Sequence, residues 1–403
     1  MTRDYYTQER RSRILVYGMN FLPERTGVGK YTGEMVEWLA ANDVEVTVVA
    51  APPYDPEWQL REGYRRFWYA SDTSFPGVRV IRCPIWVPRE PGAISRILHL
   101  LSFAITSAPV VLWLGLRRKF DLLWTVEPTL ATAPNALLAA WFARALSWLH
   151  VQDLEVDAAF ALGIAKGGFL RRLIGRVESV LTRAFDRVST ISLAMRERII
   201  QKGVPEERTL LFRNWANIDE ITPLEQPSPL RAELGIPGDA VVALYSGNMG
   251  MKQGLSVLGA AAQKLGKNTA VHFVLCGNGP GRAPLDEQVA GIDTVHVLDL
   301  QPRSRLNELL NSADIHLLPQ RDSVDQLVLP SKLTGMLASG RPVVAACGAA
   351  TELAGIVEQC GIVVPAGDAD AFAAAVTELA QDRERRLKLG RLARKIAEQE
   401  ISY

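Results

Sequence analysis

Cysteine is scarce in this chain of 403 residues, and neither sign of charge is in excess. The four cysteines are far apart, with no CxxC pair and no histidine at ligand spacing: Cys83, Cys276, Cys347 and Cys360. This pattern disfavours a disulfide framework and a structural zinc site, and it fits a reducing compartment. Lysine and arginine total 45 against 44 aspartates and glutamates, a net charge of +1. A nucleic-acid-binding protein would carry a large basic excess, so none is expected here.

A secretory signal is also not expected, because the opening residues 1–11 are polar and contain no apolar segment. What is present is ordinary for a globular protein: 48% hydrophobic and 22% charged residues. The length favours two domains with full cores. Composition alone therefore indicates an enzyme of the cytosol or of a membrane surface.

One long uncharged run stands out. Residues Ile97–Leu116 contain no aspartate, glutamate, lysine or arginine and are flanked by Arg96 and the basic residues 117–119. Twenty such residues could span a bilayer, although Pro109 and His99 lower the hydrophobicity. The favoured interpretation is a pair of buried helices in the first domain. A helix or hairpin that enters one membrane leaflet, or a true span, are the alternatives.

A basic amphipathic helix is predicted over Phe169–Phe185. Its apolar residues recur at helical spacing: Leu170, Leu173, Ile174, Val177, Leu181 and Ala184. The arginines lie elsewhere on the helix: Arg171, Arg172, Arg176 and Arg183. Such a helix can lie on anionic lipid, and the plainer interpretation is a surface helix that packs on a core.

Short apolar runs alternate with helical patterns, twice over, which predicts an α/β fold with parallel sheets. The expected strands are 13–18, 45–50 and 121–126 in the first half and 240–246, 271–276, 294–298, 315–318 and 342–346 in the second. Three prolines within Pro223–Pro229 suit an exposed linker or domain edge. We expect two Rossmann-like domains, over 1–215 and 216–384, with a C-terminal helix at 385–403 returning to the first.

Glycines follow the first strand at Gly27 and Gly29, where a following helix would offer free N–H groups to an anion. A structural turn is the plainer alternative. A P-loop does not fit, because Glu24 stands where that motif needs glycine and Lys30 is followed by Tyr31. A second glycine-rich loop, at 277–281, falls short of a dinucleotide-binding motif because its last glycine is replaced by arginine.

The second half places two lysines at helix starts. The loop Gly247–Gly254 follows a strand and carries Lys252, and the segment that starts at Pro330 presents Ser331 and Lys332. Two cationic helix starts in one domain favour a nucleotide diphosphate over a single phosphate. Surface lysines are the alternative interpretation.

Four motifs together give the chain a resemblance to the family-4 GT-B glycosyltransferases over nearly its full length. They are Pro23…Gly27-Val28-Gly29, Gly247…Lys252-Gln253-Gly254, Gly277-Asn278-Gly279-Pro280 and Pro330-Ser331-Lys332…Gly340-Arg341-Pro342-Val343-Val344. The stretches 21–27 and 150–155 resemble the colanic-acid fucosyltransferase branch and its aminosugar-transferring relatives. The resemblance implies the GT-B fold, in which two Rossmann-like domains face each other across a cleft.

The resemblance also implies an activity. It implies retaining transfer of a sugar from a nucleotide-diphosphate donor, GDP-fucose or a UDP-sugar, to a lipid-linked saccharide in exopolysaccharide or O-antigen biosynthesis. Neither a metal nor a cofactor is implied. The enzyme would be cytoplasmic and peripheral on the inner face of the cytoplasmic membrane.

Carried over residue by residue, the resemblance assigns the diphosphate to Lys252. Asn248 stands where the family often has arginine, and His150 and Asp153 stand where groups face the acceptor and the donor sugar. The remaining donor contacts fall on residues named above: Gly27, Gly29, Gly247, Ser331 and Lys332. The glutamate pair of the family is missing, since its places hold Leu327 and Gly335. Asp325 or Asp322 would have to replace these carboxylates.

Two other classes stay open at this stage. A nucleotide-sugar epimerase would share the double-Rossmann shape but needs an acid/base pair deep in the cleft, which the sequence shows only weakly. A non-catalytic subunit that binds sugar nucleotide is compatible with the missing glutamates.

Overall fold

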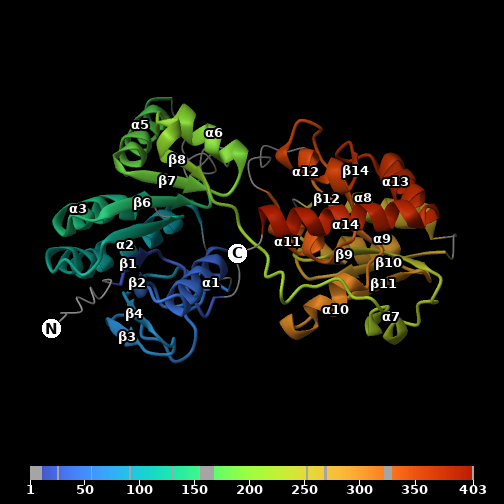
Figure 1. The fold of residues 1–403 in the computed structure, drawn as a ribbon, viewed down its shortest axis with the longest axis horizontal. Coiled ribbons are helices and arrows are strands. Elements are labelled where there is room, and N and C mark those ends of the chain that lie inside the picture. Colours follow the sequence, from blue (N-terminus) through green and yellow to red (C-terminus); the bar gives the residue numbers. More distant parts are fainter. Residues whose placement is uncertain are drawn as a thin grey trace, which may run out of the picture. The chain divides into compact units, whose positions relative to one another are not determined.

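The chain divides into two compact units, Met1–Phe212 and Arg213–Tyr403, in a computed structural model. The structure describes residues 11–24, 27–55, 57–89, 92–128, 130–154, 168–250, 253–266, 270–321 and 329–401. The sequence placed the division after residue 215, and the structure places it after Phe212. Each unit is an α/β domain built around its own sheet (Figure 1).

The first unit holds a sheet of eight strands in the order β3-β4-β2-β1-β5-β6-β7-β8. All neighbouring strands are parallel except β3 and β4. The strands are β1 (Arg13–Tyr17), β2 (Glu45–Ala50), β3 (Ala70–Asp72), β4 (Val78–Arg82), β5 (Leu122–Glu127), β6 (Leu146–Val151), β7 (Arg187–Thr190) and β8 (Thr209–Leu211). Chain order reverses between the neighbouring strands β1 and β5. At such a switch point the loops after the strands diverge and leave room for a ligand.

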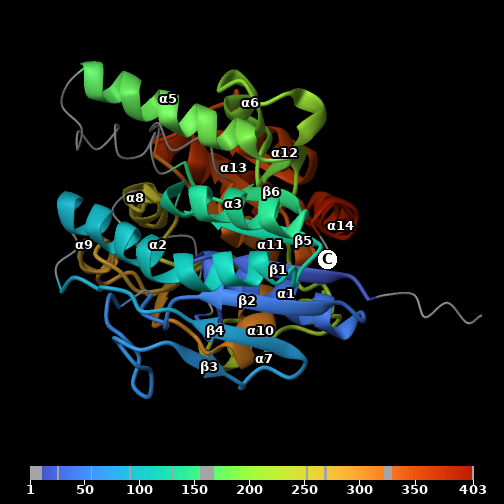
Figure 2. The same cartoon turned by 90° about the vertical axis from the view of Figure 1, so that its left-hand side faces the viewer.

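Helices cover both faces of this sheet because successive strand residues point to opposite sides. Val16 belongs to a core cluster with Val36 and Met35 of α1, whereas the hydroxyl of Tyr17 reaches Ser107 of α2 at 2.6 Å. The helices are α1 (Gly27–Ala41), α2 (Ala93–Leu116), α3 (Ala133–Ala143), α5 (Gly168–Ala184) and α6 (Leu193–Gln201), with short 3-10 turns η1 (Leu130–Thr132) and η2 (Glu206–Arg208). Figure 2 shows α2, α3 and α5 on the face turned to the viewer.

The second unit holds a six-stranded parallel sheet in the order β11-β10-β9-β12-β13-β14. Its strands are β9 (Val241–Ser246), β10 (Val271–Cys276), β11 (Val295–Leu298), β12 (Ile315–Pro319), β13 (Val343–Ala346) and β14 (Gly361–Val364). The central strands β9 and β10 are buried along their whole length and are mostly apolar, as expected of strands covered on both faces. Chain order reverses here between β9 and β12, which again marks a switch point.

The helices of the second unit pack on both faces of its sheet. One core cluster joins α8, α9 and α13 to one face, and others join α11, α12 and α14, or α7 and α10, to the opposite face. The helices are α7 (Pro229–Glu233), α8 (Ser256–Leu265), α9 (Arg282–Val289), α10 (Leu306–Asn311), α11 (Ser331–Ala338), α12 (Glu352–Cys360), α13 (Ala369–Gln381) and α14 (Arg383–Glu400), with the 3-10 turn η4 (Arg303–Arg305).

The C-terminal helix, expected to accompany the first domain, belongs to the second unit in this structure. Its residues Ala393, Ile396 and Ala397 share a core cluster with α11 and α12. Arg394 also donates hydrogen bonds to the carbonyls of Ile221 and Ala338. These apolar and polar contacts explain why α14 stays with the sheet that precedes it.

The proline-rich segment Pro223–Pro229 is not the linker between the units. It lies inside the second unit, where the Leu224 N–H donates to Asn311 at 2.9 Å and the Ser228 hydroxyl donates to the Glu308 carbonyl at 2.7 Å. Proline removes N–H donors and so prevents a helix here. The segment is nevertheless anchored to α10, through the side chain of Asn311 and the backbone carbonyl of Glu308.

The long uncharged run forms one helix, α2, and not the expected pair of buried helices. Pro109 lies inside the helix without ending it. The carbonyl that loses its partner belongs to Ile105, whose side chain is 70% exposed, so that turn faces outward. Among the described residues, α2 alone is long and apolar enough to cross a membrane, and 33% of this apolar stretch is buried. Its buried side is tied down by polar contacts from His99 and Ser107.

Helix α5 differs in part from the expected surface helix. Arg172, Arg176 and Arg183 are exposed as expected, and Ile174 and Leu181 are partly buried. Leu173 and Val177 of the predicted apolar face are exposed at 48% and 50%, however, as is the neighbouring Val180. The inner side instead buries Glu178, which forms an ion pair with Lys202 of the segment after α6, and Thr182. A buried pair of opposite charges thus takes part of the inner side that periodicity predicts to be apolar.

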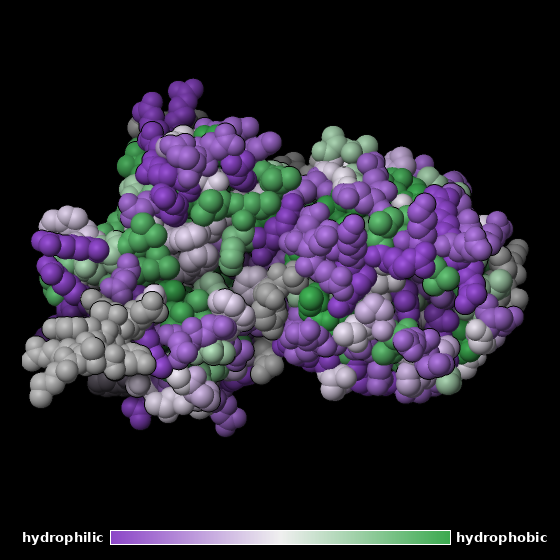
Figure 3. Space-filling view, in the orientation of Figure 1, coloured by the Kyte–Doolittle hydropathy of each residue, from purple (hydrophilic) through white to green (hydrophobic). Residues whose placement is uncertain are grey.

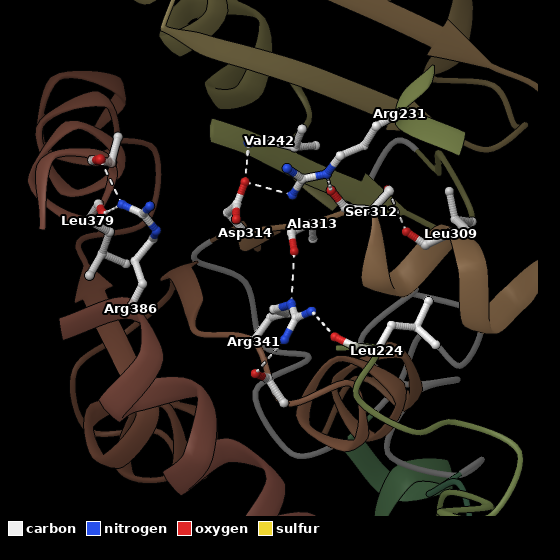
Figure 4. Close-up of polar contacts among 12 residues, drawn as sticks. Leu224, Arg231, Val242, Leu309, Ser312, Ala313, Asp314, Arg341, Leu379 and Arg386 are labelled. Atoms are coloured by element: carbon white, nitrogen blue, oxygen red, sulfur yellow. Dashed lines mark hydrogen bonds and ion pairs between the residues drawn. The ribbon is translucent and has the colours of Figure 1, made fainter. Parts of the chain in front are cut away.

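An arginine cluster joins the amino ends of the strands in the second unit. Asp314 accepts hydrogen bonds from Arg231 at 2.7 Å and from the Val242 N–H at 2.8 Å, and Arg341 donates to the Ala313 carbonyl (Figure 4). Arg341 belongs to the Gly340-Arg341-Pro342 motif of the sequence. The motif therefore braces the edge of the sheet opposite the carboxyl ends of the strands.

Candidate active site

The loops after β9 and β10 pack against each other backbone to backbone. The Gly247 N–H donates to the Cys276 carbonyl at 3.0 Å, and the Met249 N–H donates to the Asn278 carbonyl at 2.9 Å. A Cβ at Gly277 would lie 1.9 Å from the Gly247 carbonyl oxygen, and a Cβ at Gly279 would lie 2.7 Å from the Met249 oxygen. Both glycines are thus required for this close approach, which fixes the loop carrying Gly247 and Asn248.

Lys332 points from the first turn of α11 toward the end of β9. Its Nζ lies 2.9 Å from the Tyr245 hydroxyl and 3.3 Å from Oε1 of Gln253, and 4.3 Å from the centre of the Tyr245 ring. The Gly247 backbone is adjacent, since a Cβ there would lie 3.6 Å from the same Nζ. The tyrosine is held in turn by a 2.7 Å bond to the Asn248 carbonyl. Two segments far apart in sequence therefore converge at the switch point of the sheet.

Burial lowers the pKa of Lys332 to about 8, because desolvation penalises its charged form. No carboxylate lies within ion-pairing distance of this ammonium among the residues that the structure describes. The helix start beside it has no side-chain cap. A partly buried cation without a counter-ion, next to a helix N-terminus, is suited to bind an anion such as a diphosphate.

The other donor-side predictions have different outcomes. Ser331 and Asn248 are exposed beside Lys332 and the Gly247 loop, respectively. Lys252 and Asp325 lie outside the described residues. The place of the second family glutamate, Gly335, faces the side chains of Leu310 and Ile221. This position is an apolar contact in the present chain and not a site for a ligand-binding carboxylate.

In the first unit, Gly27 and Gly29 open helix α1 after β1. Gly27 has a φ of 48° and an open space around its Cβ position, as suits backbone that approaches a ligand. Gly29 is buried, with a Cβ position 2.9 Å from Cβ of Glu24. Gly29 is thus needed for packing, and Gly27 is the exposed member of the pair.

Glu24 has a role that the sequence did not reveal. Its buried carboxylate accepts hydrogen bonds from the Tyr54 and Asp55 N–H groups at 2.8 and 2.9 Å, and from Asn20 at 3.1 Å. Burial raises its pKa, and the three hydrogen bonds oppose that shift. Glu24 therefore links the loop after β1 to the loop after β2. The only sequence signal was a carboxylate three residues before the glycine pair that follows β1.

His150 does not face solvent or an open site in the described structure. It lies in β6 with 4% of its surface exposed, its Nδ1 is 2.9 Å from the Ser189 hydroxyl, and its ring packs on Trp124 and Phe212. Burial lowers its pKa to about 3, so the ring is neutral. The acceptor-facing role of His150 stays a prediction. Asp153, just beyond β6, is exposed.

Tyr245 and Gln253 were missed as site residues. Both lie against the Lys332 ammonium, and burial raises the pKa of Tyr245 well above its ordinary value. In the sequence, Tyr245 looks like any other buried strand residue. Only its position directly before Ser246 and Gly247 could have suggested that it lies beside the loop after β9.

Two Rossmann-like units, each with its switch point beside a glycine loop, are the architecture of the GT-B glycosyltransferases, and the second unit adds the partly buried Lys332. The model of a glycosyl transferase 4-like domain matches residues 26–215, and that of glycosyl transferases group 1 matches residues 240–382. The chain is 41% identical over 353 residues to the putative colanic acid biosynthesis glycosyl transferase WcaI of Escherichia coli K12, covering 86% of each chain. The chain belongs to the family-4 GT-B glycosyltransferases.

Other relatives are more distant. The probable glycosyltransferase WbjE of Pseudomonas aeruginosa is 27% identical over 268 residues, which cover 62% of this chain and 65% of WbjE. Among solved structures, sucrose-phosphate synthase from Thermosynechococcus elongatus superposes with a TM-score of 0.68 at 19% identity over 97% of this chain and 95% of that one. HepE of Anabaena, solved with UDP and glucose, gives a TM-score of 0.66 at 16% identity over 97% and 96%. These two structural matches establish the shared fold.

Proposed function

We propose that this glycosyltransferase moves a sugar, with retention of configuration, from a nucleotide-diphosphate donor to a lipid-linked saccharide in exopolysaccharide biosynthesis. The observation that carries the proposal is the Lys332 ammonium, which lies partly buried at the switch point of the second sheet without a described carboxylate partner. The relative named for colanic acid biosynthesis supports the pathway class. GDP-fucose or a UDP-sugar is the proposed donor.

Stabilisation of the leaving diphosphate is the proposed source of catalysis. Lys332 and the amino end of α11, with Ser331, would bind the phosphate oxygens on which negative charge develops, and Lys252 would add a second cation. Preorganised positive charge at a departing group is commonly the largest catalytic contribution. The acceptor hydroxyl would attack from the face that the diphosphate leaves, and a diphosphate oxygen would accept its proton. Asp153 and Asp325 are proposed to contact the donor sugar.

A panel of nucleotide sugars tests the donor class. We expect calorimetry to show tight binding of sugar nucleotides that carry one particular base. The nucleoside diphosphate of that base should bind almost as tightly, because charge pairing dominates the site. NMR of the product should show the same anomeric configuration as the donor. Binding of NAD with no sugar nucleotide bound, or product of inverted configuration, would contradict the proposal.

Metal removal should leave the activity largely intact. Lysines and helix termini fill the role that a divalent cation has in other glycosyltransferases, so chelation by EDTA removes nothing that the proposed mechanism uses. Initial rates with and without EDTA are the measurement, with added magnesium or manganese as the control. Full loss of activity that is restored by either metal would overturn this mechanism.

A further inference from the structure

A cavity of about 730 Å³ opens in the first unit, at the sheet edge opposite the carboxyl ends of the strands. It lies where α3 and α5 end and where β6 begins. Its wall is formed by Arg118, Leu137, Ala140, Trp141, Phe142, Arg144, Ala145, Ser147, Ala184 and Asp186. The volume is that of an ordinary small-ligand site. None of these residues belongs to the donor or acceptor site proposed above.

The cavity wall carries a net positive charge, from Arg118 and Arg144 against Asp186. Arg118 and Arg144 follow α2 and α3 in left-handed backbone conformations, with φ of 48° and 56°. Within the described part of the chain, neither guanidinium has a carboxylate at ion-pairing distance. Asp186, the one acidic residue of the cavity wall, accepts hydrogen bonds on one oxygen from the N–H and the hydroxyl of Ser147 at 2.8 and 2.7 Å. Two guanidinium groups are thus available for an anion.

The rim of the cavity is apolar and exposed. Val180, Val177 and Leu173 lie on one face of α5 in line with Ala184 of the cavity wall, because these positions are four, seven and eleven residues from it. On α3, Trp141 is 71% exposed. Helices α3 and α5 are neighbours on one face of the first unit (Figure 2). Figure 3 shows apolar residues at the surface of the first unit.

We propose that this surface binds the membrane and that the cavity takes the phosphate headgroup of an anionic phospholipid. Guanidinium groups pair with phosphate oxygens in bidentate geometry. Tryptophan is favoured at the membrane interface, where its ring contacts acyl chains and its N–H stays near the headgroups. The stripe from Leu173 to Ala184 is about 16 Å long, which suits a helix that lies in the plane of the interface.

This inference rests on the proposed function in one respect: membrane attachment would hold the enzyme near a lipid-linked acceptor. The cavity lies at the opposite sheet edge from the site, so the bound lipid is an anchor and not the acceptor. It also extends the membrane contact expected from the sequence. The exposed apolar stripe of α5 lies beside the exposed Arg172, Arg176 and Arg183, and the end of α3 adds to this surface.

Vesicle flotation of the full chain tests the headgroup site. Wild-type protein should float with phosphatidylcholine vesicles that contain about 30% phosphatidylglycerol, and much less with phosphatidylcholine alone. Arg118→Gln/Arg144→Gln should lower the partition coefficient about 30-fold, as expected for two basic residues near an anionic surface. The matched control, Arg383→Gln/Arg391→Gln in exposed positions of α14, should partition like the wild type.

A label on the stripe tests insertion. All four native cysteines are buried, so a fluorophore attached after Val177→Cys should report this position alone. Its emission should shift to the blue with anionic vesicles, whereas the same label after Leu387→Cys, a position of similar exposure in α14, should not change. A label at 177 that is already shielded without vesicles would show that another surface covers the stripe and would overturn the proposal.

Two further outcomes keep the tests separate. Competition by inorganic phosphate or glycerol 1-phosphate, without flotation, would identify a soluble anion site and overturn the membrane assignment. Donor affinity, measured by calorimetry without vesicles, should be unchanged in Arg118→Gln/Arg144→Gln. Loss of flotation with intact donor binding in the double variant would support the anchor. A wild-type chain that floats but binds no nucleotide sugar would refute only the proposed function.

Discussion

Lys332→Met should weaken binding of the nucleotide-sugar donor about 10- to 100-fold without destabilising the protein. A hydrogen bond to a charged group contributes about 1.5–3 kcal/mol, and the diphosphate would lose at least one such bond. Turnover should fall further, because the leaving diphosphate carries more charge in the transition state than in the bound donor. Calorimetry and initial rates are the measurements. Lys388→Met, an exposed substitution in the same unit, is the control.

Stability should move in the opposite direction in the same variant. The folded protein holds the Lys332 ammonium at a cost, since burial lowers its pKa from 10.5 to about 8. Methionine removes that cost, while the Tyr245 hydroxyl keeps its bond to the Asn248 carbonyl. We expect the free energy of unfolding at neutral pH to rise by about 1–3 kcal/mol. Urea unfolding that shows a large loss instead would identify Lys332 as a structural residue.

The depressed pKa also fixes the pH dependence. Between about pH 8 and 10.5 the unfolded chain binds the Lys332 proton and the folded chain does not, so stability relative to Lys332→Met should rise with pH in that window. Donor affinity should fall as pH rises through about 8, because the neutral amine cannot pair with the diphosphate. Bound diphosphate raises this pKa, so donor binding near pH 8 should take up a proton.

Strand positions were predictable because strands buried on both faces are continuous apolar runs. The bounds predicted for β2, Glu45–Ala50, and for β10, Val271–Cys276, agree with the structure residue for residue. The loop glycines were predictable for a similar reason, since glycine after a strand signals a close approach of backbone. These features depend on neighbours in sequence, which a single chain reveals.

The orientation of side chains was predictable only in part. Helical spacing predicted an apolar inner face for α5, of which Ile174 and Leu181 are partly buried. It did not predict that Glu178 is buried there, because the partner Lys202 lies in a separate element. The resemblance assigned His150 to the acceptor side, and the sequence did not predict that its ring packs on Trp124 and Phe212. Which face of a helix or strand is buried depends on contacts with residues distant in sequence. The local spacing of apolar residues does not reveal those contacts.

Gly277→Ala should abolish donor binding and destabilise the second unit. A Cβ here would lie 1.9 Å from the Gly247 carbonyl oxygen and 3.1 Å from its carbon, and φ at this position is 154°. The obstructing atoms are backbone, so the loops after β9 and β10 must separate. Separation would strain the bond from the Gly247 N–H to the Cys276 carbonyl and move Gly247 away from Lys332.

We expect Gly277→Ala to lower the free energy of unfolding by about 2–5 kcal/mol, the range for a backbone clash and a strained conformation together. Gly355→Ala is the matched control, because its Cβ would meet no atom within 4 Å and it lies within helix α12. That control should gain about 0.5–1 kcal/mol through helix propensity. Urea unfolding and donor calorimetry should be run on both variants under conditions where each is folded. Wild-type stability together with wild-type donor affinity in Gly277→Ala would show that the two loops do not form the donor site as a unit.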